Sequence, residues 1–374
     1  MLRFLTSGES HGKCLVTILE GMVAGLTVNA NEIDHELARR QEGYGRGGRM
    51  TLEKDKVEIL SGVRHNRSLG GPIALLIPNK DFKIDELPAV KRPRPGHADL
   101  AGVIKYDRKD VRDVLERASA RETAARVALG AICKIFLKEF GVDILSHVVG
   151  VGGVTFDAKG MTFEQIKRAS KESPMHCADP AVTKKMMARV DEAKFAKDTI
   201  GGIFEVIVRG VPPGLGSFVH YDRRLSAVLC ASLASIQAVK GVEMGMGFKV
   251  SETLGKDVHD EIFYDKKPGF YRKTNNAGGF EGGMTNGENL VLRAAMKPFA
   301  TLMRPLQSVN IESKKKEAAT VERSDVTAVP ACGVVGEAMV AFELAKSYLE
   351  KFGGDSLVET RRNFEGYLKQ IREF

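Results

Sequence analysis

Two histidines stand beside glycine in polar, loop-like sequence. They are His11, in Ser10-His11-Gly12, and His97, in Pro95-Gly96-His97-Ala98-Asp99. Residues 39–49, Arg39-Arg40-Gln41-Glu42-Gly43-Tyr44-Gly45-Arg46-Gly47-Gly48-Arg49, add guanidiniums on a glycine-rich segment that lacks the Gly-Lys-Ser/Thr ending of a nucleotide P-loop. Arginine binds carboxylate or phosphate through paired hydrogen bonds, and glycine lets backbone amides approach the same anion. Each histidine alone also suits an ordinary surface turn, but together with the arginines they predict a polyanion pocket with two proton donors.

Three further segments combine glycine, charge or hydroxyl groups. Residues 276–288 are too rich in glycine for a core element, so they form either a loop that approaches a ligand closely or a flexible turn. Lys297-Pro298-Phe299-Ala300-Thr301 follows the strand-like residues 290–294 and offers an ammonium and a hydroxyl after a rigid turn. Arg323-Ser324-Asp325 places a cation and an acid on the same side of a strand, which suits a site or an ordinary surface ion pair.

A strand, turn and helix pattern occurs twice. Residues 14–21 and 204–210 are rich in β-branched residues and end at glycine, which predicts strands, and helices are predicted at 32–40 and 225–239. The two segments align at a constant offset, with the pairs Gly12/Gly201, Ile18/Ile207, Gly21/Gly210, Gly25/Gly214 and Leu26/Leu215. The match predicts a duplicated unit and one pseudo-symmetric body, whereas length alone would suggest two or three domains.

Other segments complete a single-domain interpretation of residues 1–374. Helices are predicted at 117–140, which ends at Gly141, and at 334–352, closed by Gly353-Gly354. A charged, helix-forming insertion covers about 155–197, and residues 251–276 are interpreted as long surface loops. Neither has the Pro/Ser-rich composition of an interdomain linker.

The composition is that of a globular protein: 43% of the residues are hydrophobic and 28% are charged. No apolar run is long enough to cross a membrane, and Met1-Leu2-Arg3-Phe4 leads directly into polar sequence, so we expect a cytoplasmic protein without a signal peptide. Five widely spaced cysteines suit reduced thiols, and no Cys-x-x-Cys or His-Glu-x-x-His pattern offers a metal site.

The net charge of +8 is compatible with nucleic acid, an acidic membrane or small anions. The lysine-rich stretches have acids nearby or lie in helix-like sequence, which is typical of a solvated face, whereas the arginines cluster with glycine, serine and histidine. This distribution favours small anions. RNA binding is a weaker alternative, since residues 43–49 imitate an Arg-Gly-Gly segment but are flanked by ordered-looking sequence.

Over essentially its whole length, the sequence resembles the chorismate synthase family. The motifs that carry the resemblance are Gly8-Glu9-Ser10-His11-Gly12, residues 39–50, Arg94-Pro95-Gly96-His97-Ala98-Asp99, Arg117-Ala118-Ser119-Ala120-Arg121-Glu122-Thr123, the glycine loop 278–287, Lys297-Pro298 and Val329-Pro330-Ala331-Cys332-Gly333. The charged stretch 155–197 and the tail after Gly354 are least tied to the family pattern.

The resemblance implies a lyase that makes chorismate and phosphate from 5-enolpyruvylshikimate 3-phosphate by 1,4-anti elimination, the last step of the shikimate pathway. Reduced FMN is the implied cofactor, although the reaction has no net redox change. The substrate carries two carboxylates and a phosphate, which match the polyanion that the arginine-rich segments predict. A flavin oxidoreductase with net hydride transfer is the alternative enzyme class.

The resemblance also implies roles for individual residues. His11 is the expected general acid toward the departing phosphate, His97 the donor beside reduced flavin, and Asp325 a residue that manages the proton at flavin N5. The expected substrate ligands are Ser10, Arg40, Arg46, Arg49, Ser119, Arg121 and Arg323. The expected flavin contacts are Arg117, Ala118, Ser119, Gln237, Ala238, Gly282, Lys297, Pro298, Phe299, Ala300, Thr301 and Arg323. Arg40 and Arg46 alternatively face the phosphate of a nicotinamide nucleotide. The remaining histidines, His35, His65, His147, His176, His220 and His259, are expected to be structural.

The implied fold class is α+β, a chorismate synthase-type β-α-β sandwich with an internal pseudo-two-fold repeat, assembled as a homotetramer with FMN near the subunit contacts. NADPH is implied only as a possible source of reducing equivalents. No Gly-x-Gly-x-x-Gly opens a βαβ unit, which favours an external flavin reductase or free reduced flavin. We expect no metal, no nucleic acid and no membrane among the partners.

Overall fold

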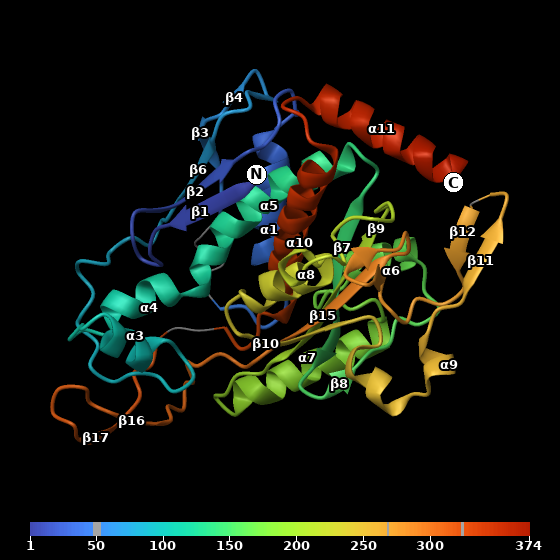
Figure 1. Ribbon diagram of the computed structural model, residues 1–374. Helices are drawn as coiled ribbons and strands as arrows, with labels where there is room; N and C mark the ends of the chain where they lie inside the picture. The colour runs from blue at the N-terminus through green and yellow to red at the C-terminus, as the bar shows by residue number, and fades with distance from the viewer. Residues whose placement is uncertain (48–53, 268, 323–324) are drawn as a thin grey trace.

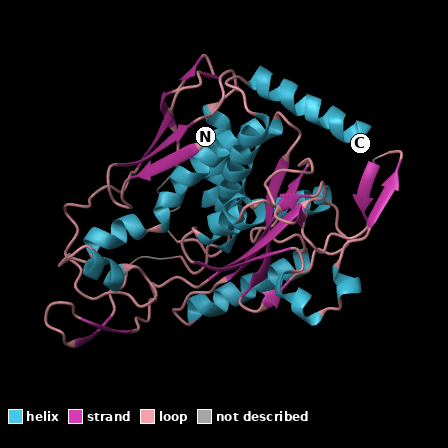
Figure 2. Ribbon diagram, in the orientation of Figure 1, coloured by secondary structure: helices cyan, strands magenta, loops and turns pink. Residues whose placement is uncertain are grey.

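Two antiparallel sheets, one from residues 3–78 and one from residues 143–296, enclose a layer of helices (Figures 1 and 2). The computed structural model describes residues 1–47, 54–267, 269–322 and 325–374. The strands of the first sheet lie in the order β1 (Arg3–Ser7), β2 (Cys14–Glu20), β6 (Ile73–Pro78) and β3 (Glu58–Ser61). The second sheet has the order β10 (Val239–Met244), β15 (Leu290–Met296), β9 (Gly202–Arg209), β7 (Asp143–Val151) and β8 (Val154–Thr155). Alternate residues of β2 and β15 are buried, as expected for strands with one face on a core.

The helix layer consists of α1 (Ala30–Gln41), α5 (Thr123–Lys138), α8 (Leu225–Ala234) and α10 (Val329–Phe352). α5 packs on β2 and β6, α10 packs on β7 and β9, and the two helices contact each other. Gly130 of α5 permits this approach, because a Cβ atom there would lie 2.4 Å from the Cβ atom of Ala338 on α10. A hydrophobic cluster therefore continues from one sheet to the other through the helices.

Glu337 of α10 is fully buried and ties the helix layer to the second sheet. Its carboxylate accepts hydrogen bonds from Arg39 of α1 (2.7 and 2.8 Å), Lys134 of α5 (2.7 Å) and Ser146 of β7 (2.7 and 2.8 Å). Burial raises the pKa of Glu337, but the charges of Arg39 and Lys134 outweigh burial, so the pKa lies well below its ordinary value. The ionised carboxylate fixes the last turn of α1, where Arg40 follows Arg39.

A smaller group of elements lies beside this body, at the lower left of Figure 1. It comprises α3 (Asp99–Lys105), α4 (Arg112–Ala118) and the hairpin of β16 (Gln307–Val309) and β17 (Lys316–Ala318). Its own apolar cluster is formed by Val90, Val103, Val111, Val114 and Leu115, with Ile311 from the hairpin packed against it. The backbone N–H of Ile311 also donates to the carbonyl of Lys91 (2.9 Å). The hairpin is thus joined to the segment that precedes α3.

The remaining elements lie on the outside. α6 (Phe163–Glu172) and α7 (Pro180–Phe195) pack against β7 and β8, and they begin at the capping side chains of Thr162 and Asp179. α11 (Leu357–Glu373) follows α10 and packs against it. The short elements are β4 (Val63–Arg64), β5 (Arg67–Ser68), η1 (Ala120–Glu122), η2 (Tyr221–Arg223), η3 (Gly247–Glu252), α9 (Gly255–Val258), β11 (Ile262–Asp265), β12 (Gly269–Arg272), β13 (Phe280–Glu281) and β14 (Met284–Thr285).

The predicted strands at 14–21 and 204–210 are confirmed as β2 and β9, but the continuous helix predicted at 117–140 is wrong. α4 ends at Ala118, Ser119 is extended (φ −63°, ψ 141°), and η1 and α5 follow. The Ser119 hydroxyl accepts from the backbone N–H of Arg121 (3.3 Å), so it caps a new helical start where composition alone favours one helix.

Other helices also begin or end at residues that differ from the predicted ones. The helix predicted at 225–239 ends at Ala234, because the chain enters β10 at Val239. The helix predicted at 334–352 begins at Val329. Pro330 is in its first turn, where the backbone N–H that proline lacks would have no partner within the helix. The predicted helix 32–40 lies within α1, and the helix-forming stretch 155–197 contains α6 and α7. Residues 251–276 are not only loops, since they contain α9 and the β11–β12 hairpin.

Within the described ranges, no helix has the length and apolar character needed to cross a membrane. The same residues contain no group of His, Cys, Asp or Glu side chains that could hold a metal ion. The five cysteines, all in described positions, are unpaired, as the sequence predicted.

Candidate active site

A cavity of about 980 Å³ is lined by residues of the helix layer and of the smaller group that carries α3 and α4. It gathers residues that are far apart in the sequence. The predicted site residues that line it are Ser10, His11, Arg40, Arg46, His97, Ala118, Ser119, Arg121, Gln237, Ala238, Lys297, Phe299, Ala300, Thr301 and Asp325. The arginines and the two imidazoles singled out in the sequence therefore line one cavity.

Local structure explains why these side chains meet. Arg40 is in the last turn of α1, and the interruption of the helical run at Ser119 turns the chain at the cavity wall. Lys297 and the residues after it follow the end of β15, and the N-terminal turns of α10 supply an apolar wall through Ala331, Cys332 and Val335. Helix and strand ends thus bring the polar residues to one place.

His11 is held by Glu116 of α4. The imidazole Nδ1 lies 2.9 and 3.1 Å from the two carboxylate oxygens of Glu116, and the backbone N–H of His11 donates to the same side chain (2.9 Å). His11 Nε2 lies 3.9 Å from a carboxylate oxygen of Asp81, which also lines the cavity. Arg112 donates to Glu116 from the far side (2.9 Å).

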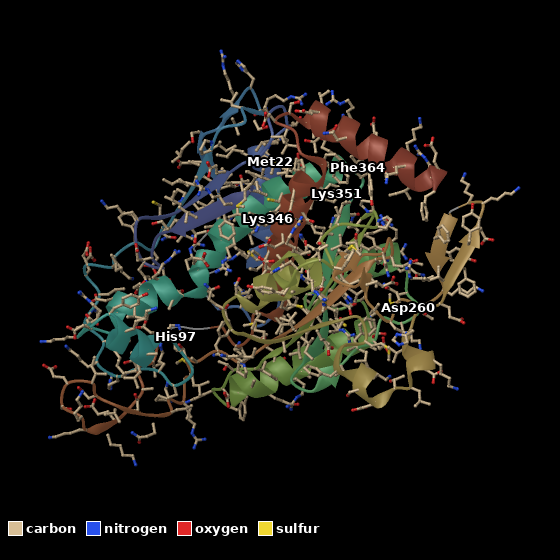
Figure 3. All side chains as sticks on the ribbon, in the orientation of Figure 1. Met22, His97, Asp260, Lys346, Lys351 and Phe364 are labelled. Atoms are coloured by element: carbon tan, nitrogen blue, oxygen red, sulfur yellow. The ribbon has the colours of Figure 1, made fainter. Side chains whose placement is uncertain are left out.

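His97 has a similar environment beside α3, where Figure 3 labels it. Its Nδ1 contacts the carboxylate of Asp99, which is fully buried. Asp99 also accepts from the Arg94 side chain (2.8 and 3.1 Å) and from the Arg94 backbone N–H (3.0 Å). Burial raises the pKa of Asp99, but the hydrogen bonds from His97 and Arg94 outweigh burial and lower that pKa well below its ordinary value. Asp99 is thus an ionised partner for the His97 ring.

Two guanidiniums share a buried carboxylate. Arg121 donates to Asp55 over 2.7 Å and to the amide oxygen of Asn79 over 2.9 Å, and Arg40 Nη1 lies 3.6 Å from Asp55. Burial lowers the pKa of Arg40 to about 10, and the nearby Arg121 charge contributes. Arg40 Nη1 and Arg121 Nη2 are buried without a hydrogen-bond partner among the described residues. These N–H groups are suited to an incoming oxyanion.

Arg46 and Asp325, predicted as separate site residues, form a pair with 3.1 Å between Nη1 and Oδ2. The backbone N–H of Gly47 donates to the other Asp325 oxygen (2.6 Å). Burial lowers the pKa of Arg46, while the Asp325 charge opposes this shift. The glycine-rich segment is thereby joined to the residues that precede α10.

Two lysines give the wall near β10 a concentrated positive charge. Lys297 and Lys240 both line the cavity, and Lys297 Nζ lies 3.2 Å from the carbonyl of Pro298. Burial and the Lys240 charge lower the pKa of Lys297. Among the described residues, the lining lysines and arginines are Arg40, Arg46, Lys83, Arg94, Arg121, Lys240 and Lys297, and they outnumber the lining carboxylates Asp81, Glu322 and Asp325. The cavity therefore favours a polyanion.

The same cavity has features that suit a flat, partly apolar cofactor. Gln237 donates to Glu122 (3.0 Å), and its amide oxygen is buried without a partner among the described residues. Such an oxygen can accept from an N–H of a heterocyclic ring. Apolar side chains of Ile236, Val239, Met296 and Phe299 lie on the same wall. The residues present thus fit a flavin ring as well as anionic groups.

Some predicted residues do not line this cavity of the single chain. Arg117 is directed to the carbonyl oxygens of Gly8 (3.0 Å) and Thr6 (2.8 Å), and Pro298 lies between lining residues without joining them. Gly282 is in the turn between β13 and β14, with Phe218 as its near neighbour. Arg49 and Arg323 lie outside the described residues.

The other six histidines, all at described positions, do not line the cavity. His147 is buried, with Nε2 3.0 Å from Glu205. Burial lowers the pKa of His176. His35, His65, His220 and His259 are exposed.

Sequence reasoning gave no role to several charged residues at the site. Arg94 and Asp99 belong to the motif that contains His97, so their spacing to that histidine was an available signal. Glu116 and Asp55 contact site residues that are distant in the sequence, and no local pattern marks them. Lys83 and Lys240 appear as ordinary surface lysines in the sequence.

Arginines aimed at an anion, two imidazoles backed by carboxylates and an apolar wall define an enzyme that acts on a small polyanionic substrate. A family model described as chorismate synthase matches residues 2–349. The chain is 52% identical to the chorismate synthase of Geobacter sulfurreducens over all of both chains, and 52% identical to that of Symbiobacterium thermophilum over 99% of each. A crystal structure of chorismate synthase is similar with a TM-score of 0.83 and 43% identity, covering 100% of this chain and 99% of that one. The chain belongs to the chorismate synthase family and is a lyase with an α+β fold.

Proposed function

We propose that the cavity is where this chain carries out the reaction of its family, the 1,4-anti elimination of phosphate from 5-enolpyruvylshikimate 3-phosphate to give chorismate. This reaction is the last step of the shikimate pathway, which leads to the aromatic amino acids. The substrate has two carboxylates and a phosphate, all of which need cationic partners in a site that excludes water.

The observation that carries the assignment of the site is the pair of buried N–H groups on Arg40 and Arg121. A buried donor without an acceptor is costly, so its presence at a cavity wall points to a ligand oxygen that accepts from it. Ser10 and Ser119 are nearby hydroxyl donors on the same wall. We assign these four residues, with Arg46, to the substrate. Arg49 and Arg323 are proposed as further substrate ligands on the family resemblance.

His11 is proposed as the general acid. With Nδ1 directed to Glu116, its Nε2 is the nitrogen left for a ligand, and a proton held there can pass to the phosphate oxygen as the C–O bond breaks. An imidazole is suited to this task because it holds and releases a proton near neutral pH.

Reduced FMN is the proposed cofactor, and the residues that would hold it are Ala118, Ser119, Gln237, Ala238 and Lys297 through Thr301. When bound, it supplies an electron that is returned in the same turnover, so the reaction has no net redox change. His97, oriented by Asp99, would donate to the reduced ring and stabilise its charge. Asp325, held by the Gly47 N–H, would hold the proton exchanged at flavin N5. Arg117, Gly282, Pro298 and Arg323 are proposed as flavin contacts on the family resemblance.

NADPH is proposed only as a source of reducing equivalents, with an external flavin reductase or free reduced flavin as the supply. Arg40 and Arg46 remain the alternative contacts for a nicotinamide nucleotide phosphate.

We also expect a homotetramer, which light scattering of the purified protein would test. The cytoplasmic location stays a prediction.

We further propose that the whole chain is one domain built from a duplicated unit. Strand order supports the proposal: β1, β2, β6 and β3 in the first sheet correspond to β7, β9, β15 and β10 in the second. α1 follows β2 as α8 follows β9, and α5 and α10 occupy equivalent places after the last strands. Gly21 and Gly210 end the equivalent strands with φ angles of 91° and 85°, and Gly25 and Gly214 follow at 85° and 88°.

An anaerobic assay tests the proposed function. With dithionite-reduced FMN in catalytic amount, we expect chorismate and phosphate to form in equal amounts without consumption of nicotinamide nucleotide. Stoichiometric nicotinamide oxidation would instead indicate a flavin oxidoreductase with net hydride transfer.

A further inference from the structure

We propose that Glu116 is a positioning residue for His11: it holds Nδ1 of the imidazole and so orients Nε2 toward the cavity. The inference rests on the proposed function of His11 as general acid. Glu116 itself does not line the cavity, so it acts through the histidine and not on a ligand.

Glu116 holds both the ring and the backbone of His11. Its carboxylate oxygens lie 2.9 and 3.1 Å from Nδ1, and one of them accepts the backbone N–H of His11 over 2.9 Å. The backbone N–H of Ser10 also donates to the carbonyl oxygen of Glu116 (3.0 Å). Glu116 accepts all of these hydrogen bonds. They leave the imidazole little freedom to turn, because both the ring at Nδ1 and the backbone of His11 are held.

Several charged groups on the surrounding elements act on His11. From α4 come Glu116 and, behind it, Arg112, and the segment after β6 contributes Asp81, 3.9 Å from Nε2, and Lys83, which pairs with Asp81 over 3.0 Å. Arg112 is also held by Glu322 over 3.2 Å. Each of the two cations is neutralised by a carboxylate. Among the described residues, Glu116 is the acid within hydrogen-bond distance of the ring, so its carboxylate sets the orientation of the imidazole through Nδ1.

His11 and Arg112 together keep Glu116 ionised. The side chain is almost completely buried, and burial alone raises its pKa. The hydrogen bonds and charge of His11, together with the hydrogen bond from Arg112, outweigh burial and lower the pKa of Glu116. Because Arg112 remains charged at every relevant pH, the carboxylate keeps an electrostatic partner after His11 has given up a proton.

The proposed proton transfer runs from His11 to the departing phosphate. The C–O bond to the phosphate breaks and its electron pair leaves with the phosphate oxygen, which takes the proton from His11 Nε2. The C6–H bond of the substrate breaks in the same turnover, its electrons complete the new ring double bond, and the hydrogen leaves as a proton to solvent. His11 is then neutral, with its remaining proton on Nδ1 donated to Glu116. A proton from water restores the imidazolium before the next turnover.

Glu116→Gln tests the proposal, because glutamine keeps the size but removes the charge. We expect kcat to fall roughly 10²-fold, within the range for a positioned acid or base, while KM for the substrate stays near its wild-type value. Asp113→Asn is the matched control, because Asp113 lies on the same helix but pairs with the exposed Arg108. It should leave both quantities unchanged.

A second readout needs no bound flavin. Diethyl pyrocarbonate modifies neutral imidazole, and peptide mass spectrometry follows its rate at His11. In Glu116→Gln, at one fixed pH, this modification should be faster than in the wild-type protein, because the carboxylate no longer holds the ring at Nδ1. An unchanged kcat together with an unchanged modification rate would overturn the proposal. If the glutamine variant does not fold, Glu116→Asp replaces it: the shorter side chain should lower kcat, and an unchanged kcat would count against the positioning role.

The double variant His11→Ala/Glu116→Gln separates this proposal from the proposed function. If Glu116 acts through His11, adding the glutamine to His11→Ala should cost less than about twofold in kcat, because the two residues form one unit. Near-normal activity of His11→Ala alone would remove His11 from the mechanism. An inactive His11→Ala with a fully active Glu116→Gln would leave the general acid in place and reject only the positioning role.

Discussion

Arg121, which lines the candidate active-site cavity, donates a 2.7 Å hydrogen bond to Asp55, and both residues are buried. Asp55 thereby also reduces the repulsion between Arg121 and Arg40, whose Nη1 lies 3.6 Å from the same carboxylate. The spacing of the two guanidiniums depends on an acid that itself does not line the cavity.

Asp55→Asn should therefore weaken both folding and substrate binding. Removing one partner of a buried ion pair costs about 3–5 kcal/mol, and here two cations lose their shared acid. We expect a lower free energy of unfolding in a urea titration and a higher KM for the substrate. A variant with wild-type KM would show that the arginines are placed without Asp55. Asp85→Asn, at an exposed position in the segment after β6, is the control.

Arg46→Lys and Arg121→Lys test whether the arginines bind through their geometry. Lysine keeps the charge but lacks the planar fork, so KM should rise substantially, on the order of tenfold or more. If the residues supply only a diffuse positive field, lysine should substitute freely and KM should increase smoothly with salt in the wild-type protein. Kinetics of both variants at two salt concentrations distinguish these cases. Arg49, predicted with them, can be tested in the same series.

His97→Ala should lower turnover roughly 10²–10⁴-fold, as expected for a positioned proton donor. Asp99→Asn should act in the same direction, because the pKa of Asp99 is lowered by His97 and Arg94 and its charge is therefore present at neutral pH. Both variants are measured with saturating reduced FMN, and FMN affinity is measured separately by calorimetry. Full activity of His97→Ala would exclude a role for this imidazole in the reaction.

Glu337→Gln should lower stability in a pH-dependent way. A carboxyl whose pKa is lower in the folded chain contributes stability that is fully present above its unfolded value and lost as pH falls through the folded value. The ordinary value is 4.5. At pH 7 the variant should lose about 3–5 kcal/mol of unfolding free energy, and the difference from wild type should shrink below about pH 4.5.

Urea titrations between pH 3 and 8 provide the check. Glu373→Gln, at the exposed end of α11, should show no such trend. A difference between Glu337→Gln and wild type that grows as the pH falls would contradict the assigned direction of the pKa shift.

Sequence motifs predicted the cavity well where functional groups stand together in glycine-rich loops. His11, His97, Arg40 and Arg46 all line it. Two of the carboxylates that hold site residues, Glu116 and Asp55, were not assigned, because their partnerships form only in the folded chain. Glu116 meets His11 across a sequence separation of 105 residues, and Asp55 meets Arg121 across 66.

The ends of the helices were likewise predicted less well from the sequence than their existence. The interruption at Ser119 lies in a run of good helix formers, and local propensity favours continuation. The serine cap and the contacts of Arg121 with Asn79 and Asp55 stabilise the turn instead. Likewise, α8 ends where the next residues gain strand partners in β15, a long-range contact that composition does not record.

The neighbouring residues Arg39 and Arg40 have different roles: Arg39 stabilises the fold, and Arg40 lines the cavity. Consecutive helical residues point about 100° apart, so the first guanidinium meets Glu337 while the second faces the cavity. Neither can stand in for the other. Deleting a single residue earlier in α1 would move Arg40 to the place of Arg39 and bring Gln41 to the cavity, so the length of this helix is under the same constraint as the chemistry it serves.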